Sequence, residues 1–161
     1  MFSVSATTRP KREQEVDGRD YFFLTKEQFA EKVGHGELIE WEEIYGERYG
    51  SLRSEVVKGL EAGRNVLFDI DVKGALSFKR QYPRESVLIF IKPPGMEVLA
   101  QRLRKRKTEV DSTLQKRLER VPMELKMGDE FDYCVINDDL TRAVQEVDEI
   151  IRHEIIPVQR V

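Results

Sequence analysis

The fold of this chain is decided by the stretch Asn65-Val66-Leu67-Phe68-Asp69-Ile70-Asp71-Val72-Lys73-Gly74. Its apolar run leads directly into Asp69, which predicts a strand buried on both faces, as in the parallel sheet of an α/β domain. Open α/β sheets bind ligands at the carboxyl ends of their strands. One acid of the pair Asp69 and Asp71 could therefore serve a metal or phosphate and the other a substrate donor. A polar strand exit followed by a helix N-cap is the alternative interpretation.

Composition limits the classes of protein to consider. A chain of 161 residues, 40% hydrophobic and 35% charged, fits one α/β domain over residues 1–161 with a small insertion. The net charge of −3 argues against a globally basic nucleic-acid binder. The longest apolar runs are of strand length, and residues 1–15 contain no signal-peptide pattern. We therefore expect a cytoplasmic protein with neither nucleic-acid nor membrane partners; the oligomeric state stays open.

The single cysteine, Cys134, lies in the apolar, strand-like stretch 133–137. This position predicts a core thiol rather than a nucleophile. One cysteine allows neither a disulfide framework within the chain nor a cysteine-rich zinc site.

The first forty residues contain two groups suited to binding anions and bases. Residues 2–8 alternate as a strand, and the following loop carries Arg9 and Arg12. Guanidinium groups match phosphate oxygens with two hydrogen bonds each, so both arginines could converge on one anion; a solvated basic loop is the alternative. Glu40 lies among apolar residues in the expected strand 37–41, and guanine offers a buried carboxylate two adjacent donors.

The segment after this strand is expected to be turn-rich, with hydroxyls from Tyr45, Tyr49 and Ser51. Either ligand contact or ordinary packing could explain the tyrosines. Ser51 is predicted to cap a helix that ends near Gly63. Upstream, Thr25-x-x-Gln28 predicts a capping box at the start of another helix.

The second half is predicted to form a helix over 75–82, strands over 86–92 and 133–137, and a helix over 140–155. Between Arg102 and Arg120 there are eight basic and three acidic residues. A basic flap that closes over polyphosphate, a solvated charged helix and an RNA contact all remain possible. Pro122 is expected to kink or end its helix.

Seven sequence blocks occur together in an order and spacing that resemble the guanylate kinase family nearly end to end. They are Phe2-Ser3-Val4-Ser5-Ala6-Thr7-Thr8-Arg9-x-x-Arg12, Gly18-x-Asp20-Tyr21, Leu38-Ile39-Glu40-Trp41, Tyr49-Gly50-Ser51, Asp69-Ile70-Asp71-Val72-x-Gly74, Phe90-Ile91-x-Pro93-Pro94 and Asn137-Asp138. The resemblance implies the P-loop nucleoside monophosphate kinase type of α/β fold. That fold has a three-layer αβα core, an inserted GMP-binding subdomain and a helical lid. The corresponding subregions are 1–60 for GMP binding, 61–95 and 119–161 for the core, and 96–118 for the lid.

The same resemblance implies transfer of the γ-phosphoryl group of ATP to GMP, with Mg²⁺ accompanying ATP. GMP would be bound by Ser5, Arg9, Arg12, Tyr21, Glu40, Tyr49, Ser51, Asp71 and Gly74. ATP would be bound by Arg102, Arg106, Arg117 and Asn137. Arg12, Arg106, Arg117 and Asp69 would be catalytic, with Asp69 next to the metal.

Three departures from the family pattern are visible. The sequence contains no Gly-x-x-x-x-Gly-Lys-[Ser/Thr] loop, with which guanylate kinases begin after a first strand. We therefore expect a chain shortened at its start and impaired in catalysis; a non-catalytic module that binds GMP or a phosphopeptide is the alternative. Lys73 replaces the usual glutamine, and Lys107 replaces a glycine of the lid turn.

Overall fold

The computed structural model describes residues 1–105 and 111–155. It divides into two compact units, Met1–Phe78 and Lys79–Ile155, which are considered separately. The expectation of one domain over residues 1–161 stays a prediction. Among the described helices, none has both the length and the apolar character needed to cross a membrane.

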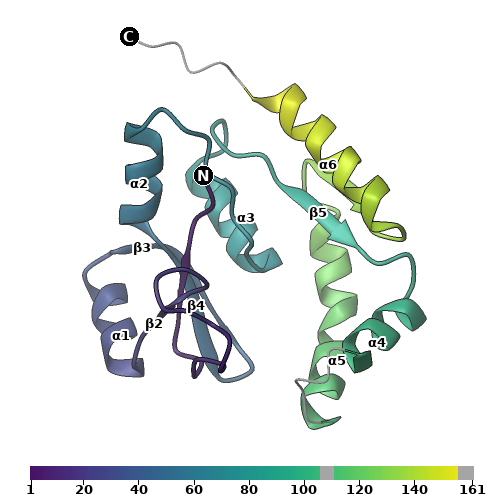
Figure 1. Ribbon diagram of the computed structural model, residues 1–161, viewed down its shortest axis with the longest axis horizontal. Helices are drawn as coiled ribbons and strands as arrows, with labels where there is room; N and C mark the ends of the chain where they lie inside the picture. Colours follow the sequence, from purple (N-terminus) through teal and green to yellow (C-terminus); the bar gives the residue numbers. More distant parts are fainter. Residues whose placement is uncertain (106–110, 156–161) are drawn as a thin grey trace. The chain divides into compact units, whose positions relative to one another are not determined.

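The first unit is built on a four-stranded sheet in the order β2-β1-β4-β3 (Figure 1). Its strands are β1 (Ser5–Thr7), β2 (Phe22–Phe23), β3 (Leu38–Ile44) and β4 (Glu47–Leu52). Its helices are α1 (Lys26–Gly34), α2 (Arg53–Glu61) and the greater part of α3 (Val72–Gln81). β1 pairs with β2 in parallel and with β4 antiparallel, and β3 pairs with β4 antiparallel.

One face of this sheet is apolar and packs on α1. Ala6 and Phe29 are fully buried there with Leu38 and Leu52. Gly50 lies opposite Ala6 in the ladder. A Cβ atom on Gly50 would lie 2.8 Å from the Glu40 carbonyl oxygen, so only glycine fits between the strands. Because side chains alternate along a strand, the neighbouring positions of β1 and β4 face the other way and are polar.

In the segment 25–52, one local expectation is confirmed and two are wrong. Thr25 and Gln28 form the predicted capping box of α1. The supposed turn-rich segment is instead a hairpin whose two-residue turn, Tyr45-Gly46, has φ of 57° and 83°, the signature of a type I′ turn. Ser51 does not cap α2: it lies within β4, and Leu52 occupies the N-cap without a side-chain hydrogen bond.

The stretch 65–74 is less regular than its sequence suggests. Leu67 makes one bridge, to Phe2, and is 53% exposed, so the predicted strand buried on both faces is wrong for the described chain. α3 begins at Val72 rather than at Ala75. The side chain of Asp71 accepts hydrogen bonds from the backbone N–H groups at 73 and 74, 2.9 and 3.2 Å long, and so caps α3. The N-cap interpretation of this acid is therefore confirmed.

The second unit contains two parallel strands, β5 (Ile89–Lys92) and β6 (Tyr133–Ile136). Its helices are α4 (Met96–Lys105), α5 (Asp111–Gly128) and α6 (Leu140–Glu154). α5 continues through Pro122, so this proline does not end its helix.

The two strands of this unit are shorter than predicted and buried on one face. Val135 is fully buried, whereas Ile91 and Ile136 are 52% and 45% exposed. Cys134 is exposed as well, because it alternates with Val135, and the prediction of a core thiol is wrong.

Candidate functional site

The polar face of the first unit's sheet brings predicted base-binding residues together. Ser5 lies directly opposite Ser51, and Ser51 lies opposite Glu40 across the β3–β4 ladder. The Ser51 hydroxyl donates a 2.6 Å hydrogen bond to Oε1 of Glu40. Glu40 is only 6% exposed, as its apolar neighbours predicted. The arrangement forms a buried carboxylate acceptor held in place by a serine.

The electrostatics of Glu40 favour a ligand that donates hydrogen bonds. Burial raises the pKa of Glu40, and the negative charges of Asp71 and Glu42 raise it further, against the opposing effect of hydrogen bonds from Ser51. Burial deprives this carboxylate of water, so a base that offers further hydrogen-bond donors would stabilise its charge.

Gly74 leaves room for this carboxylate at the start of α3. A Cβ atom on Gly74 would lie 2.4 Å from Oε2 of Glu40, a separation too short for any pair of atoms that are not bonded. The side chain of Asp71 accepts a hydrogen bond from the backbone N–H of the same Gly74, and its negative charge raises the pKa of Glu40. The predicted residues Ser5, Glu40, Ser51, Asp71 and Gly74 thus form one group.

A second group surrounds the guanidinium of Arg9. Its carbon lies 5.4 Å from the centroid of the Tyr21 ring, and the rings of Tyr21 and Tyr49 are 6.2 Å apart. The pKa of Arg9 is raised, first by its hydrogen bonds with Glu15, against the opposing effect of burial, and then by Tyr49. Burial raises the pKa of Tyr21, and the charge of Asp69 raises it further. A cation flanked by two phenol groups is suited to bind an anion.

Arg12 meets the same carboxylate as Arg9. Its backbone N–H donates a 2.8 Å hydrogen bond to Glu15, and its guanidinium lies 3.9 Å from the other oxygen of that carboxylate. The Arg12 side chain is 51% exposed. The two arginines therefore converge on one anion, which here is the protein's own Glu15. Sequence reasoning missed Glu15; the available signal was its position three residues after Arg12 and six after Arg9.

Asp69 is exposed at the end of the apolar run. Among the described residues, no three His, Cys, Asp or Glu side chains gather as a metal-binding group. A single accessible carboxylate suits Mg²⁺ that arrives already bound to phosphates, because this ion keeps several waters and needs only one or two protein ligands.

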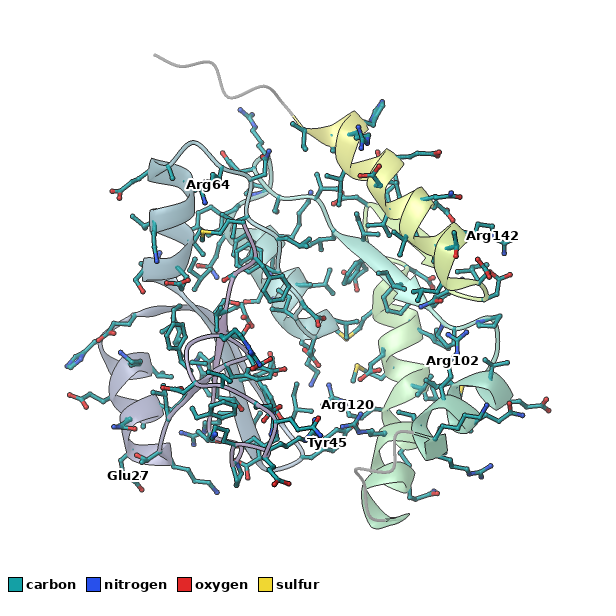
Figure 2. All side chains as sticks on the ribbon, in the orientation of Figure 1. Glu27, Tyr45, Arg64, Arg102, Arg120 and Arg142 are labelled. Atoms are coloured by element: carbon teal, nitrogen blue, oxygen red, sulfur yellow. The ribbon has the colours of Figure 1, made fainter. Side chains whose placement is uncertain are left out.

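The second unit brings together two residues predicted to bind ATP. Arg102, which is labelled in Figure 2, lies on α4. It donates a 2.7 Å hydrogen bond to the carbonyl oxygen of Asn137 and a 3.3 Å one to that of Asp138. Asp139 then caps α6 through the Arg142 backbone N–H. Arg102 thus supports the loop between β6 and α6.

The other two arginines assigned to the lid are only partly described. Arg117 lies in α5. Arg106 lies outside the described residues, as does Lys107.

Known proteins are similar to this chain over most of its length. The guanylate kinase family matches residues 1–154. A guanylate kinase of Thermotoga maritima is 47% identical over 160 residues, covering 99% of this chain and 77% of the relative. A guanylate kinase of Chlorobaculum tepidum is 49% identical over 146 residues, covering 91% and 75%. The crystal structure of guanylate kinase from Anaplasma phagocytophilum superposes with a TM-score of 0.82 at 32% identity, covering 96% of this chain and 75% of that one.

Proposed function

The chain belongs to the guanylate kinase family, and we propose that the polar face of its β1–β4–β3 ladder is the site that binds GMP. Enzymes of this family are transferases that move the γ-phosphoryl group of ATP to GMP. The observation that carries the proposal is the buried Glu40 carboxylate, fixed by Ser51 on the same unit as the Arg9 cluster.

Guanine would be recognised by its two adjacent Watson–Crick donors. The N1–H and amino groups of guanine match the carboxylate of Glu40, whereas adenine presents an acceptor at its N1 position. Ser51 keeps the carboxylate oriented, and Ser5 and Asp71 add polar groups beside it. A carboxylate buried among apolar residues discriminates strongly, because a base without these donors leaves it unpaired.

The phosphate of GMP would lie against Arg9 and Arg12, with the hydroxyls of Tyr21 and Tyr49 as further donors. Guanidinium–phosphate pairs are charge-assisted and bidentate, so they fix the orientation of the acceptor oxygen as well as binding it. In phosphoryl transfer most of the catalysis is positioning and stabilisation of charge, which is the role we assign to Arg12.

ATP would be bound by the residues of the second unit. We assign Asn137 to the adenine side, Arg102 to the support of its loop, and Arg106 and Arg117 to the transferring phosphates. Mg²⁺ would be held by the phosphates of ATP and by Asp69. The metal ion would neutralise the charge that develops on the phosphate oxygens.

Replacement of Arg9 tests the GMP site. We expect Arg9→Met to weaken GMP binding by at least about tenfold, because a charge-assisted bidentate pair contributes more than ~1.4 kcal/mol. The affinity for guanosine, which carries no phosphate, should stay within about twofold. Titration calorimetry with both ligands measures the two effects.

Arg19→Met is the matched control, because Arg19 is an exposed arginine on the same segment, paired with Asp20. It should leave both affinities unchanged. GMP binding by Arg9→Met as tight as by the unmodified chain would contradict the proposed phosphate site.

A further inference from the structure

The carboxylate of Glu15 organises the loop that carries both arginines. Its Oε1 accepts a 2.7 Å hydrogen bond from Nη2 of Arg9, and its Oε2 accepts a 3.0 Å one from Nη1. Oε2 also accepts the Arg12 backbone N–H at 2.8 Å. The side chains of Arg9 and Glu15 are 17% and 15% exposed, so this pair is largely removed from water.

The remaining contacts of Arg9 fix the plane of its guanidinium. The group lies 5.4 and 5.7 Å from the ring centroids of Tyr21 and Phe23, and Nη1 also donates to the Pro10 carbonyl oxygen at 2.8 Å. A guanidinium has two edges that can each bind an anion with two hydrogen bonds, one between the terminal nitrogens and one that includes Nε. Glu15 occupies the terminal edge.

We propose that Glu15 is a positioning residue for the phosphate subsite: it holds Arg9 by its terminal edge so that the edge containing Nε is presented to the phosphate of GMP. The inference rests on the proposed function, because it takes Arg9 to be a phosphate ligand. Glu15 was not among the residues that sequence reasoning assigned to the site.

The carboxylate of Glu15 also has properties that oppose phosphate binding. Its negative charge repels a phosphate, and a carboxylate that occupied the phosphate position would compete with GMP. The geometry favours positioning over competition, because Glu15 is part of the loop's own turn. Its backbone N–H donates to the Arg12 carbonyl oxygen at 3.1 Å, and Lys11 donates to its carbonyl oxygen at 3.1 Å. The guanidinium also separates the two anions.

The charge of Glu15 is constant over the pH range of any enzyme assay. Hydrogen bonds from Arg9 lower the pKa of Glu15 to about 2, against the opposing effect of burial and with the help of the Arg12 backbone N–H. Changes in GMP affinity near neutral pH therefore cannot come from titration of this group.

Replacement of Glu15 by its neutral isostere tests the inference. We expect Glu15→Gln to weaken GMP binding about tenfold, by analogy with the loss of about 10- to 100-fold when the partner that orients a metal-binding side chain is removed. Guanosine binding should stay within about twofold, because the base site is untouched. In the Arg9→Met background, the further change Glu15→Gln should have no added effect on GMP, because Glu15 acts through Arg9. Calorimetry on the full chain and its variants, with GMP and with guanosine, measures these affinities.

Glu13→Gln is the matched control: Glu13 is an exposed acid on the same loop, and its replacement removes the same charge. It should leave GMP binding unchanged. GMP binding by Glu15→Gln that equals or exceeds that of the unmodified chain would overturn the inference while leaving the proposed site intact. If Arg9→Met itself has no effect, the proposed site fails and the inference with it.

A loss of guanosine binding in Glu15→Gln would indicate misfolding, and Glu15→Asp then decides. This variant keeps the charge and shortens the reach to Arg9. It should lose GMP affinity and retain guanosine affinity; unchanged GMP affinity would overturn the inference.

Discussion

Phosphoryl transfer by the 161-residue chain is expected to be at least ~10³-fold slower than by an extended version of the same chain. The extension consists of a strand, a Gly-x-x-x-x-Gly-Lys-[Ser/Thr] loop and a helix placed before Met1. Such a loop surrounds the phosphates of ATP with backbone N–H groups and contributes a lysine, and a single preorganised donor of this kind is worth about 10²–10³ in rate. GMP-dependent production of ADP by the two polypeptides measures the difference.

The control for this comparison is the extended chain with the loop lysine replaced by alanine, which should fall back toward the rate of the short chain. Strong turnover by the 161-residue chain would contradict the prediction. An extended chain that binds GMP but remains inactive would favour a non-catalytic binding module, with Lys107 as the next position to test.

The extension should also raise the melting temperature, for a separate reason. In the first unit Phe2 and Leu67 form a β-bridge with each other, and each is 53% exposed. Burial of apolar surface contributes about 25 cal/mol per Å², so a few hundred Å² would add several kcal/mol. A melting temperature unchanged by the extension would show that the added segment does not cover these side chains.

The second large effect is expected at Glu40. Glu40→Gln should weaken GMP binding by about 100-fold, because the amide places a donor against the guanine donors and about 2.7 kcal/mol of charge-assisted hydrogen bonding is lost. Glu43→Gln is the matched control: it removes the same charge from the same strand at a side chain that is 57% exposed. Equal GMP affinity in Glu40→Gln and the unmodified chain would show that Glu40 does not bind the base.

The same replacement should make the ligand-free protein more stable at neutral pH. Burial raises the pKa of Glu40, so folding favours its protonated form and the carboxylate opposes folding. This penalty is absent in acid below the unfolded-state pKa and is complete above the raised pKa of the folded state. Glu40→Gln should therefore melt higher than the unmodified chain at neutral pH, and the difference should vanish in acid. A lower melting temperature at neutral pH would contradict this assignment.

Gly74→Ala tests the same pocket by a steric route. The added methyl group would overlap Oε2 of Glu40, so the carboxylate must move away from Ser51 and GMP binding should fall with it. Gly34→Ala is the control, because a Cβ atom there meets nothing within 4 Å. Unimpaired GMP binding by Gly74→Ala would mean that Glu40 can shift without loss of function.

Local chemistry in the sequence predicted the residues of the base site well. Glu40 was expected to be buried because apolar residues flank it on both sides, and it is 6% exposed. The capping box at Thr25 was also predictable, since two side chains and the adjacent backbone determine it. The helix predicted over 140–155 from its apolar spacing is observed as Leu140–Glu154.

Features that depend on distant parts of the chain were not predictable. The apolar run 66–68 has strand chemistry, but a strand also needs partners, and Leu67 finds only one bridge. The burial of Cys134 was predicted wrongly, because the sequence of an apolar strand with one exposed face cannot be told from that of a strand buried on both faces. Ser51 had a good capping signature but donates to Glu40 instead, a contact set by the register of β3 on β4. The contact of Glu15 with Arg9 depends on how the loop folds back.

The central claim is that the first unit holds the GMP site, and calorimetry of the 161-residue chain with GMP and ATP tests it most directly. The base and phosphate groups assigned to GMP all lie within residues 5–74, whereas these 161 residues contain no Gly-rich loop for the phosphates of ATP. We predict that GMP binds more tightly than ATP and that Glu40→Gln removes the difference. Tighter binding of ATP than of GMP would contradict the account.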